Sequence, residues 1–468
     1  MRARRAGRWC LAAAFLLTAC GQGHSNGSST PARSSPPIPV PSTSTSTDTS
    51  AAPQPVPDDW PTYHRDGARA GNAPSSRQAG RLTSAFTRQL DGAVYAEPIV
   101  VQDRLIVATE NNTVYAFDAA TGTLRWQRHL ATPVPRSALS CGNIDPEGIT
   151  STPAYDASTH RVFVVAEQQP GVRHDLYGVD LTSGNVTLHR SADPPNQSAT
   201  SMQERAALLV AHGRVYWAYG GLAGDCGDYH GHVVSVPVTG AGAMTYYRVP
   251  TPREGGIWAP PGPVLAADGH IYVSVGNGES TTSYDGSDSV IELDANLERV
   301  SYFAPTTWSE DNKQDLDLGS LGPTLVGPNV FIAGKRGLGY LARQNALGGL
   351  GGELAAHPVC KAFGGTARIG STVYVPCTDG VREVRVGSRD FTLGWQAARN
   401  ITGSPVAGRG AVWSLDPSGG TLYGLNPATG RVVASQPVGT TTRFATPTIW
   451  GDEVFVGTES GVVALKVS

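Results

Sequence analysis

A short unit of alternating strands and polar turns recurs along most of this chain. In its clearest copy, residues 113–126, an alternating run leads into Asp118-Ala119-Ala120-Thr121-Gly122 and then to a Trp. Weaker copies occupy residues 176–184 and 422–430. Alternation with a period of two gives strands with one buried face, and Thr-Gly supplies a turn residue at positive φ. The repeat therefore favours an all-β fold.

Prolines open the predicted strands of successive units. They are Pro98, Pro153, Pro261, Pro323, Pro405 and Pro447. Degenerate units near Ala206 and Gly365 bring the total to about eight units of roughly 35–50 residues, which is the spacing of propeller blades. The last unit ends at Ser468 with about three strands, so residues 82–90 are expected to supply its outermost strand. We predict one β-propeller of about eight four-stranded blades, closed by this N-terminal strand. A pair of β-sandwiches is disfavoured, since no linker divides the chain near its middle.

The N-terminal 19 residues have the composition of an export signal. Arginines precede an apolar run, residues 9–17, which is too short to span a bilayer as a stable helix. The run ends in Leu17-Thr18-Ala19-Cys20-Gly21, which resembles the lipobox of bacterial lipoproteins, in which the cysteine is lipid-modified. We predict a signal over residues 1–19, a lipid on Cys20, and a protein anchored on the extracytoplasmic side of a membrane. An ordinary secretory signal with an incidental cysteine is the alternative.

Composition separates a stalk from a folded body. Residues 20–58 are rich in Ser, Thr, Pro and Gly and bear almost no large apolar side chains, so we predict a disordered stalk there and the propeller over residues 59–468. Loss of the signal's four arginines changes the formal net charge from −3 to −7. Phosphate binding needs clustered cations, so nucleic acid is not expected as a partner. We expect a monomer.

The predicted mature body retains an even number of cysteines: Cys141, Cys226, Cys360 and Cys377. In an oxidising compartment this indicates disulfides. We prefer the pairs Cys141–Cys226 and Cys360–Cys377, because the last two lie in neighbouring strand-like stretches. A zinc site is the alternative, but the sequence contains no Cys-x-x-Cys spacing.

The segment from Asp118 to Trp126 resembles the repeat of pyrroloquinoline quinone (PQQ) dehydrogenases and of their non-enzymatic relatives, which include lipoproteins of outer-membrane assembly. The resemblance covers nearly all of the chain from Trp60 onward. This motif is specific for the fold and says little about chemistry.

The central units resemble the dehydrogenases more closely, in the family's order along the chain. The resemblance implies calcium ligands at Glu167, Asn277 and Asp317, a quinone floor at Trp258, a catalytic base at Asp317 or Asp315, and cofactor contacts from Lys335 and Arg173. Oxygen ligands suit calcium, which would act as a Lewis acid. A carboxylate can take the alcohol proton, a lysine can stabilise a reduced quinone, and a Trp can stack on its ring.

Each of these residues also has a structural interpretation. Asn277 lies between two glycines in a sequence typical of a turn, Lys335 can guard an edge strand, and Trp258 can belong to the core. His230 and His232 beside Cys226 could bind a metal or simply form a surface turn. The adjacent cysteine pair of the enzymes and a Cys-x-x-Cys-His haem motif are both absent from this sequence. The Arg and Thr or Ser residues with which the enzymes hold the cofactor carboxylates have no identified counterparts in this sequence.

Two functions remain open at this point. The first is a lipid-anchored binding or scaffold propeller at the cell envelope, engaging a protein or small molecule at its face. The alternative is a calcium- and PQQ-dependent alcohol dehydrogenase. The second requires Glu167, Trp258, Asn277, Asp317 and Lys335 to converge at the mouth of the central channel.

Overall fold

The computed structural model describes residues 58–73 and 80–468. The predicted signal, the lipid site at Cys20 and nearly all of the stalk lie outside the described residues. No described helix combines the length and apolarity needed to cross a bilayer.

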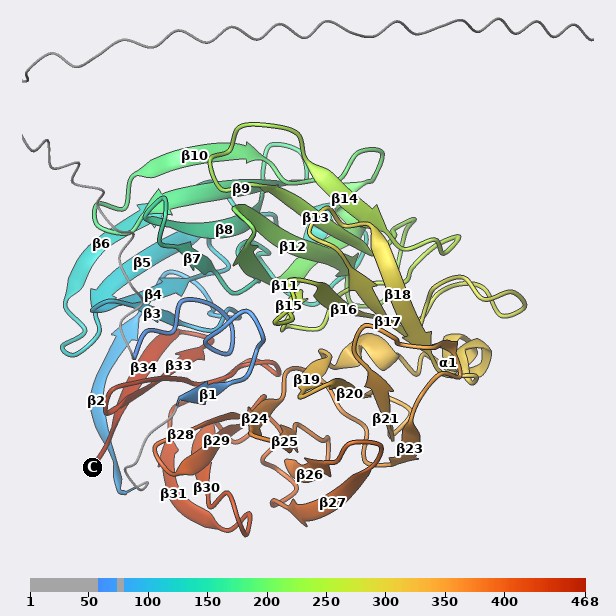
Figure 1. The fold of residues 1–468 in the computed structure, drawn as a ribbon. Coiled ribbons are helices and arrows are strands. Elements are labelled where there is room, and N and C mark those ends of the chain that lie inside the picture. The colour runs from blue at the N-terminus through green and yellow to red at the C-terminus, as the bar shows by residue number, and fades with distance from the viewer. Residues whose placement is uncertain (1–57, 74–79) are drawn as a thin grey trace, which may run out of the picture. The chain divides into compact units, whose positions relative to one another are not determined.

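Eight antiparallel blades surround a central axis (Figure 1). The innermost strands are β3 (Ile99–Val101), β7 (Ala154–Asp156), β11 (Met202–Ala211), β15 (Val264–Leu265), β19 (Thr324–Val326), β24 (Ala367–Ile369), β28 (Val406–Gly408) and β32 (Thr448–Trp450). The second strands are β4 (Arg104–Ala108), β8 (Arg161–Gln168), β12 (Arg214–Gly221), β16 (Ile271–Val275), β20 (Asn329–Ala333), β25 (Thr372–Val375), β29 (Ala411–Asp416) and β33 (Glu453–Thr458).

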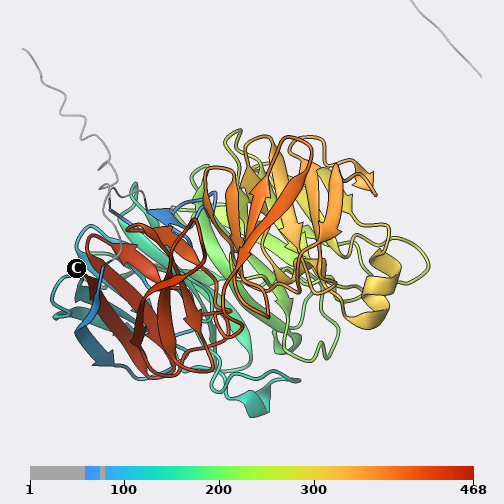
Figure 2. The same ribbon diagram turned by 90° about the horizontal axis from the view of Figure 1, so that it is seen from below.

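The two outer layers complete the blades, which Figure 2 shows side-on. The third strands are β5 (Thr113–Asp118), β9 (Arg173–Asp180), β13 (His232–Pro237), β17 (Ser289–Leu293), β21 (Leu338–Arg343), β26 (Arg382–Val386), β30 (Thr421–Leu425) and β34 (Gly461–Val467). The outermost are β6 (Leu124–His129), β10 (Val186–Ser191), β14 (Thr245–Arg248), β18 (Arg299–Ala304), β23 (Ala355–Pro358), β27 (Phe391–Gln396), β31 (Val432–Pro437) and β2 (Leu82–Gln89). The additions are β1 (Asn72–Ala73) beside β28, β22 (Gly349–Leu350) beside β18, and the helix α1 (Trp308–Gln314).

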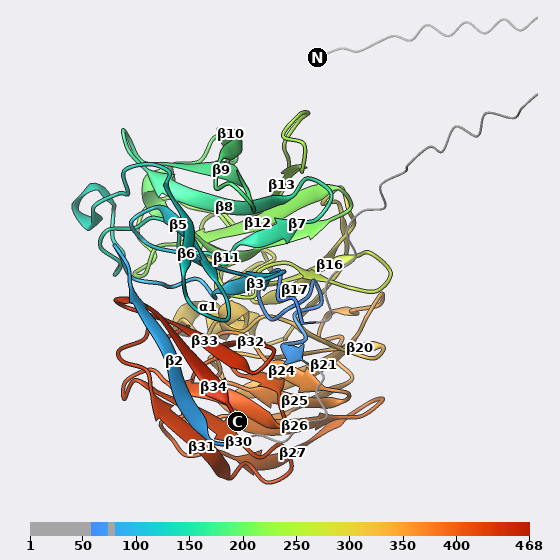
Figure 3. The ribbon, with the colours of Figure 1, turned by 90° about the vertical axis from the view of Figure 1, so that its left-hand side faces the viewer.

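The predicted eight-bladed ring and its closure are confirmed. Strand β2 pairs antiparallel with β34, from Leu82 opposite Val467 to Gln89 opposite Gly461, so the N-terminal strand completes the last blade (Figure 3). Five of the six strand-opening prolines stand immediately before an innermost strand, and Pro261 stands three residues before β15.

Neighbouring blades are joined by a side chain that packs on the next blade's Thr-Gly or Ser-Gly turn. The Trp126 indole donates to the Leu181 carbonyl at 2.9 Å and covers Gly184. A Cβ on Gly184 would lie 2.6 Å from that ring, and φ there is +69°, so glycine is required twice over. Trp395 covers Gly430 in the same way. Phe86 of β2 covers Gly122, so ring closure uses the same contact.

Residues 58–73, which we call the hub segment, cross the centre at one end of the propeller. The segment hydrogen-bonds the innermost strands, or the residues leading into them, in seven blades; the partners are Val100, Tyr155, Leu208, Leu265, Arg368, Ala407 and Thr446. Its Trp60 and His64 are fully buried and both donate to the buried Glu97 carboxylate at 2.8 Å. The hub segment therefore ties the innermost strands of seven blades together at one end of the propeller.

Two disulfides brace the loops between strands. The structure joins Cys141 to Cys226, with 6.1 Å between their Cα atoms, and Cys360 to Cys377, with 5.7 Å. This is the pairing preferred from the sequence.

Candidate functional site

A cavity of about 360 Å³ lies on the axis, at the other end of the innermost strands from the hub segment. Strand β11 relates the two: its Gln203 and Arg205 line the cavity, whereas the Leu208 carbonyl accepts bonds from hub residues Thr62 and Arg69. The remaining lining residues are Tyr95, Asn143, Gly221, Leu222, Ala223, Gly224, Asp225, Trp258, Asp315, Asp317, Lys335, Phe363, Thr441, Thr442, Arg443, Phe444 and Glu459.

Lys335 lies between the two aspartates that the sequence singled out. Its Nζ is 2.5 Å from Asp317 Oδ2 and 2.6 Å from Asp315 Oδ1. Burial raises the pKa of Asp317, and the Lys335 charge opposes that rise. Lys335 itself has a raised pKa, because its two carboxylates outweigh the effect of its burial. The group is therefore a lysine salt-bridged to one buried and one exposed carboxylate.

Trp258 and Asn277 complete this group. The Asn277 backbone N–H donates to Asp317 Oδ1 at 2.6 Å, and the Lys335 Nζ lies 5.8 Å from the centre of the Trp258 ring. Gly276 lets these approach: a Cβ there would stand 2.6 Å from Asp317 Oδ1 and 3.1 Å from Trp258 Nε1. Four of the five residues named in order along the chain are thus brought together.

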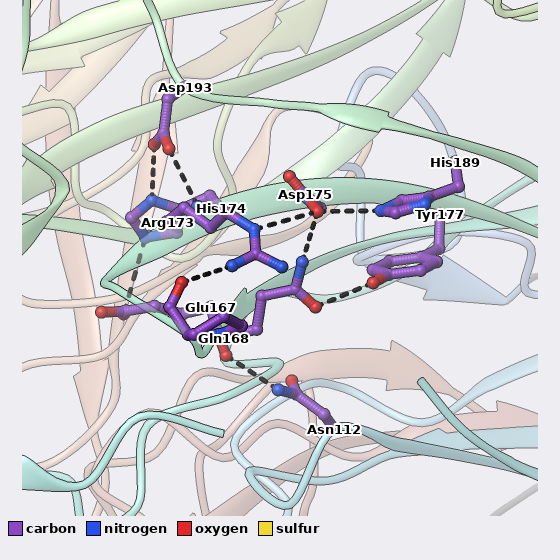
Figure 4. Close-up of polar contacts among 10 residues, drawn as sticks. Asn112, Glu167, Gln168, Arg173, His174, Asp175, Tyr177, His189 and Asp193 are labelled. Carbon is purple, nitrogen blue, oxygen red and sulfur yellow. Dashed lines mark hydrogen bonds and ion pairs between the residues drawn. The ribbon is translucent and has the colours of Figure 1, made fainter. Parts of the chain in front are cut away.

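Glu167 stands apart from this group, inside the blade of β7 to β10 (Figure 4). It faces His174 at 3.5 Å, and His174 Nδ1 lies 2.7 Å from Asp193. Burial alone would lower the pKa of His174, but Asp193 and Glu167 together hold it well above its usual value. A protonated imidazole between two carboxylates therefore already balances the charge of Glu167.

Arg173 is also outside the cavity. Its guanidinium reaches the Pro170 carbonyl at 2.6 Å and Asp175 at 3.5 Å, both in the same blade (Figure 4). Arg173 therefore belongs to the group of side chains around Asp175, which Gln168 and His189 also contact.

The three residues predicted as calcium ligands do not form one set of donors. Glu167 faces His174, Asp317 is salt-bridged to Lys335, and the Asn277 side-chain amide lies 3.4 Å from Glu254. Among the described residues, no group of three or more acidic, histidine or cysteine side chains could hold a metal ion. The geometry does not fit calcium at these positions.

The histidines near Cys226 are occupied by protein partners. His230 Nε2 lies 2.8 Å from the Pro252 carbonyl and 2.5 Å from Arg248. His232 Nδ1 lies 2.8 Å from the His230 carbonyl. The surface-turn interpretation accounts for both.

Several cavity residues were not expected from the sequence. Phe363 and Phe444 flank Trp258 with ring centres 6.4 Å and 6.2 Å away. Arg443 stacks 4.1 Å above Phe363, and Arg205 lies 5.0 Å from the centre of Phe444. The wall of the cavity thus combines aromatic rings with cationic side chains.

Comparison with known proteins agrees with the blade geometry. The family model described as outer membrane protein assembly factor BamB, a PQQ-type repeat model, matches residues 79–224. A polyvinylalcohol dehydrogenase of Pseudomonas sp. is 22% identical over 304 residues, covering 59% of this chain and 45% of that protein. One of Sphingopyxis sp. is 26% identical over 255 residues, covering 47% of this chain and 35% of that protein. The chain is a PQQ-type β-propeller.

Solved structures of an alcohol dehydrogenase and of a BamB protein both resemble this PQQ-type propeller. The quinohemoprotein alcohol dehydrogenase ADHIIG of Pseudomonas putida HK5 superimposes with a TM-score of 0.71 at 14% identity, covering 88% of this chain and 80% of that one. BamB from Moraxella catarrhalis gives 0.58 at 15% identity, covering 83% of this chain and all of that one. At such identities the match shows the fold alone. The PQQ-type propeller spans less than half the length of the curated relatives it matches.

Proposed function

We propose that this chain is an exported, lipid-anchored binding propeller at the cell envelope, whose central cavity holds a flat aromatic ligand of the PQQ class. The observation that carries the proposal is the aromatic wall. Trp258, Phe363 and Phe444 line one cavity with Lys335, and about 360 Å³ is within the usual range for a small-molecule site.

The residues present fit a quinone of this class better than they fit a metal. Trp258 would stack on the ring, and Lys335 would place its positive charge beside a carbonyl oxygen. A bound PQQ would supply a two-electron acceptor. Because the predicted calcium ligands are dispersed, we expect PQQ to bind equally well with and without calcium.

The test is calorimetric titration of the full chain with PQQ, in calcium and in EGTA, with tryptophan fluorescence followed in parallel. We expect saturable micromolar binding in both buffers. Trp258→Phe should weaken it at least threefold and remove most of the quenching, because the stacked indole is lost. Trp126→Phe, which alters an interblade Trp away from the cavity, is the matched control. No heat and no quenching at micromolar PQQ would refute the proposal.

A second candidate is a PQQ-dependent alcohol dehydrogenase that does not use Glu167, Asn277 and Asp317 as one calcium site. The placement of the buried Asp317 beside Lys335, Asn277 and Trp258 favours it, since a buried carboxylate with a raised pKa suits proton transfer. The test is alcohol oxidation with PQQ and an artificial electron acceptor, in calcium and in EGTA. Activity that disappears in Asp317→Asn while PQQ still binds would establish this candidate. Binding without turnover would leave the binding propeller.

A further inference from the structure

The disulfide between Cys141 and Cys226 lies at the rim of the axial cavity. Cys141 belongs to the connection between β6 and β7, and Cys226 to the loop between β12 and β13, so the bond joins loops that are 85 residues apart. Both loops line the cavity with exposed residues, Asn143 from the first and Ala223 and Gly224 from the second. A movement of either loop therefore changes the entrance to the cavity.

Residues 135–146, which we call the rim hairpin, form an excursion from the connection between β6 and β7. Its base is closed by Val134 and Glu147, whose backbones exchange hydrogen bonds of 2.9 Å and 2.8 Å. Within it, Arg136 donates from its side chain to the Gly142 carbonyl at 2.7 Å and from its backbone N–H to Asp145 at 3.0 Å. The excursion stands out from the blades (Figure 2, in teal). It is thus braced internally and can move about its base as one body.

The tip of the rim hairpin is held to the rest of the described chain by short-range contacts around the disulfide. The Gly142 N–H donates to the Ala223 carbonyl, and the Ser140 N–H to the Thr200 carbonyl, both at 3.1 Å. Leu139 packs on Leu222 in a small apolar cluster separate from the blade cores. Partly exposed contacts of this kind open readily when no covalent bond holds them together.

The loop on the other side of the disulfide is anchored without it. Arg253 donates to the Asp225 carbonyl at 2.9 Å and to the Gly227 carbonyl at 3.2 Å. The Tyr229 hydroxyl donates to the Asp225 carboxylate at 2.6 Å, and Tyr229 is buried. Cleavage of the disulfide would therefore release the rim hairpin and leave residues 222–231 in place.

The two disulfides of the protein differ in their exposure to a reductant. Cys141 and Cys226 are both partly exposed, whereas Cys377 is 0% exposed within the core of its blade. Thiol–disulfide exchange requires a thiolate to reach one of the two sulfur atoms. A dithiol in solution therefore has better access to Cys141–Cys226 than to Cys360–Cys377. The second pair is a matched control, because neither of its cysteines is among the residues that line the axial cavity.

We propose that the Cys141–Cys226 disulfide is a redox-sensitive clasp on the entrance to the axial cavity. While the bond is formed, it holds the rim hairpin against residues 222–225 and narrows the entrance. A dithiol reductant opens the clasp: one thiolate attacks a sulfur atom, the S–S bond breaks, and a mixed disulfide forms. The second thiol resolves the mixed disulfide, so the reductant becomes a disulfide and two electrons and two protons pass to Cys141 and Cys226. The rim hairpin then moves on its base and the entrance widens.

The first measurement is hydrogen exchange of the full chain by mass spectrometry, before and after treatment with dithiothreitol under native conditions. Iodoacetamide traps the thiols, and peptide mapping locates them. We expect the clasp cysteines to be alkylated before the other pair. The amides of Ser140 and Gly142 should then exchange about tenfold faster, whereas that of Val134, at the base, should not change. Unchanged exchange at the tip of the hairpin after reduction would overturn the proposal.

The second measurement tests entry to the cavity with acrylamide, a neutral quencher of tryptophan fluorescence. Among the described residues that line the cavity, Trp258 is the one tryptophan, so its emission is the difference between the wild type and Trp258→Phe. We expect its quenching constant to rise at least about twofold on reduction, and equally in the double variant Cys141→Ser with Cys226→Ser. The double variant Cys360→Ser with Cys377→Ser, measured without reductant, should leave it unchanged.

The outcomes separate a clasp from a disulfide that only stabilises the fold. If removal of either disulfide raises the quenching constant equally, general loosening explains the effect and the clasp is refuted. If the rim hairpin exchanges faster but the quenching of Trp258 is unchanged, the hairpin does not control the entrance and the proposal also fails. If the double serine variant of the clasp does not fold, the reduced wild type, with its native circular dichroism spectrum, supplies the result.

The clasp can be tested independently of the proposed function, because acrylamide reports on the entrance whether or not PQQ binds. If PQQ does bind, its association rate should rise at least about twofold on reduction, since the entrance is wider. Quenching that rises on reduction without any binding of PQQ would leave the clasp intact and remove the proposed ligand class.

Discussion

The carboxyl group of Glu110 is buried, since only 2% of the residue is exposed to solvent. Its Oε2 accepts from the Gly148 N–H at 2.7 Å and from Thr150 at 3.1 Å, while Oε1 has no partner. Burial raises the pKa of this carboxyl to about 8; the two hydrogen bonds oppose the rise and Glu167 adds to it. The folded protein therefore keeps a proton that the unfolded chain releases at neutral pH.

This difference predicts a pH-dependent effect of Glu110→Gln. In the wild type, the contribution of Glu110 to the free energy of unfolding is greatest below the unfolded pKa, near 4.5, and is lost as pH rises to the folded pKa, about 8. Glutamine does not titrate. We expect the variant to match the wild type near pH 4 and to exceed its stability near pH 8 by on the order of 3 kcal/mol.

Urea unfolding at both pH values measures this difference. Glu310→Gln, at a carboxylate that is 50% exposed, serves as the control and should show no such trend. An equal effect of Glu110→Gln at both pH values would show that the proton is not held in the folded state.

At this scale the sequence located some site residues and missed others for identifiable reasons. Trp258, Asn277, Asp317 and Lys335 were found because the segments around them resemble those of the dehydrogenases, in the same order along the chain. Glu167 was assigned to a metal because its partner was not considered. His174 stands opposite it in the β8–β9 register, a pairing that the intervening Gln-Pro-Gly turn could have suggested.

The cavity arginines Arg205 and Arg443 had no comparable signal. Arg205 and Arg443 are far apart in the chain and meet only because β11 and the lead-in to β32 reach the same cavity. The charged pair Glu204 and Arg205 within strand β11 was the one hint. Whether such a residue faces a cavity or a carboxylate depends on blades that the local sequence does not specify.

Among the elements, the contact between Trp126 and Gly184 allows a controlled test of blade packing. In Gly184→Ala, the added Cβ would stand 2.6 Å from the indole ring at a φ of +69°. In Gly213→Ala, φ is nearly the same, +68°, but nothing lies within 4 Å. The second variant therefore measures backbone strain alone, about 1 kcal/mol, and the first adds steric overlap of about 1–3 kcal/mol.

Chemical denaturation of the two variants should show Gly184→Ala to be the less stable by that overlap. Equal losses would mean that the indole moves aside without cost and does not fix the spacing of the blades.

Element prediction succeeded where the pattern was local and failed where it was not. The alternating runs and their prolines located the innermost strands, because strand period and turn chemistry are properties of neighbouring residues. The helix α1 and the short strands β1 and β22 were not predicted. Each has at most seven residues, too few for a periodic signal, and β1 and β22 form by pairing with distant partners.

For the whole molecule, the two disulfides should differ in what they contribute. Cys141–Cys226 closes 85 residues and Cys360–Cys377 closes 17. The chain-entropy model assigns about 5 kcal/mol to the first and about 3 kcal/mol to the second. We therefore expect Cys141→Ser with Cys226→Ser to lower the free energy of unfolding more than the corresponding double substitution of the other pair.

Guanidinium unfolding of the two double variants checks this order. The reverse order would mean that contacts in the unfolded chain or around the Cys360 loop outweigh loop length.

The hub segment and the cavity lie at opposite ends of β11, and this arrangement determines how a ligand can enter and leave the cavity. The segment is hydrogen-bonded to seven blades and closes one end of the central channel. In the described part of the chain, the centre of the propeller is therefore a cavity that opens at the other end and not a through-channel. Whatever enters must leave by the same mouth. A partner protein bound over that opening would hold the ligand inside the cavity. Binding of the partner and binding of the ligand would then be thermodynamically coupled, each increasing the affinity for the other.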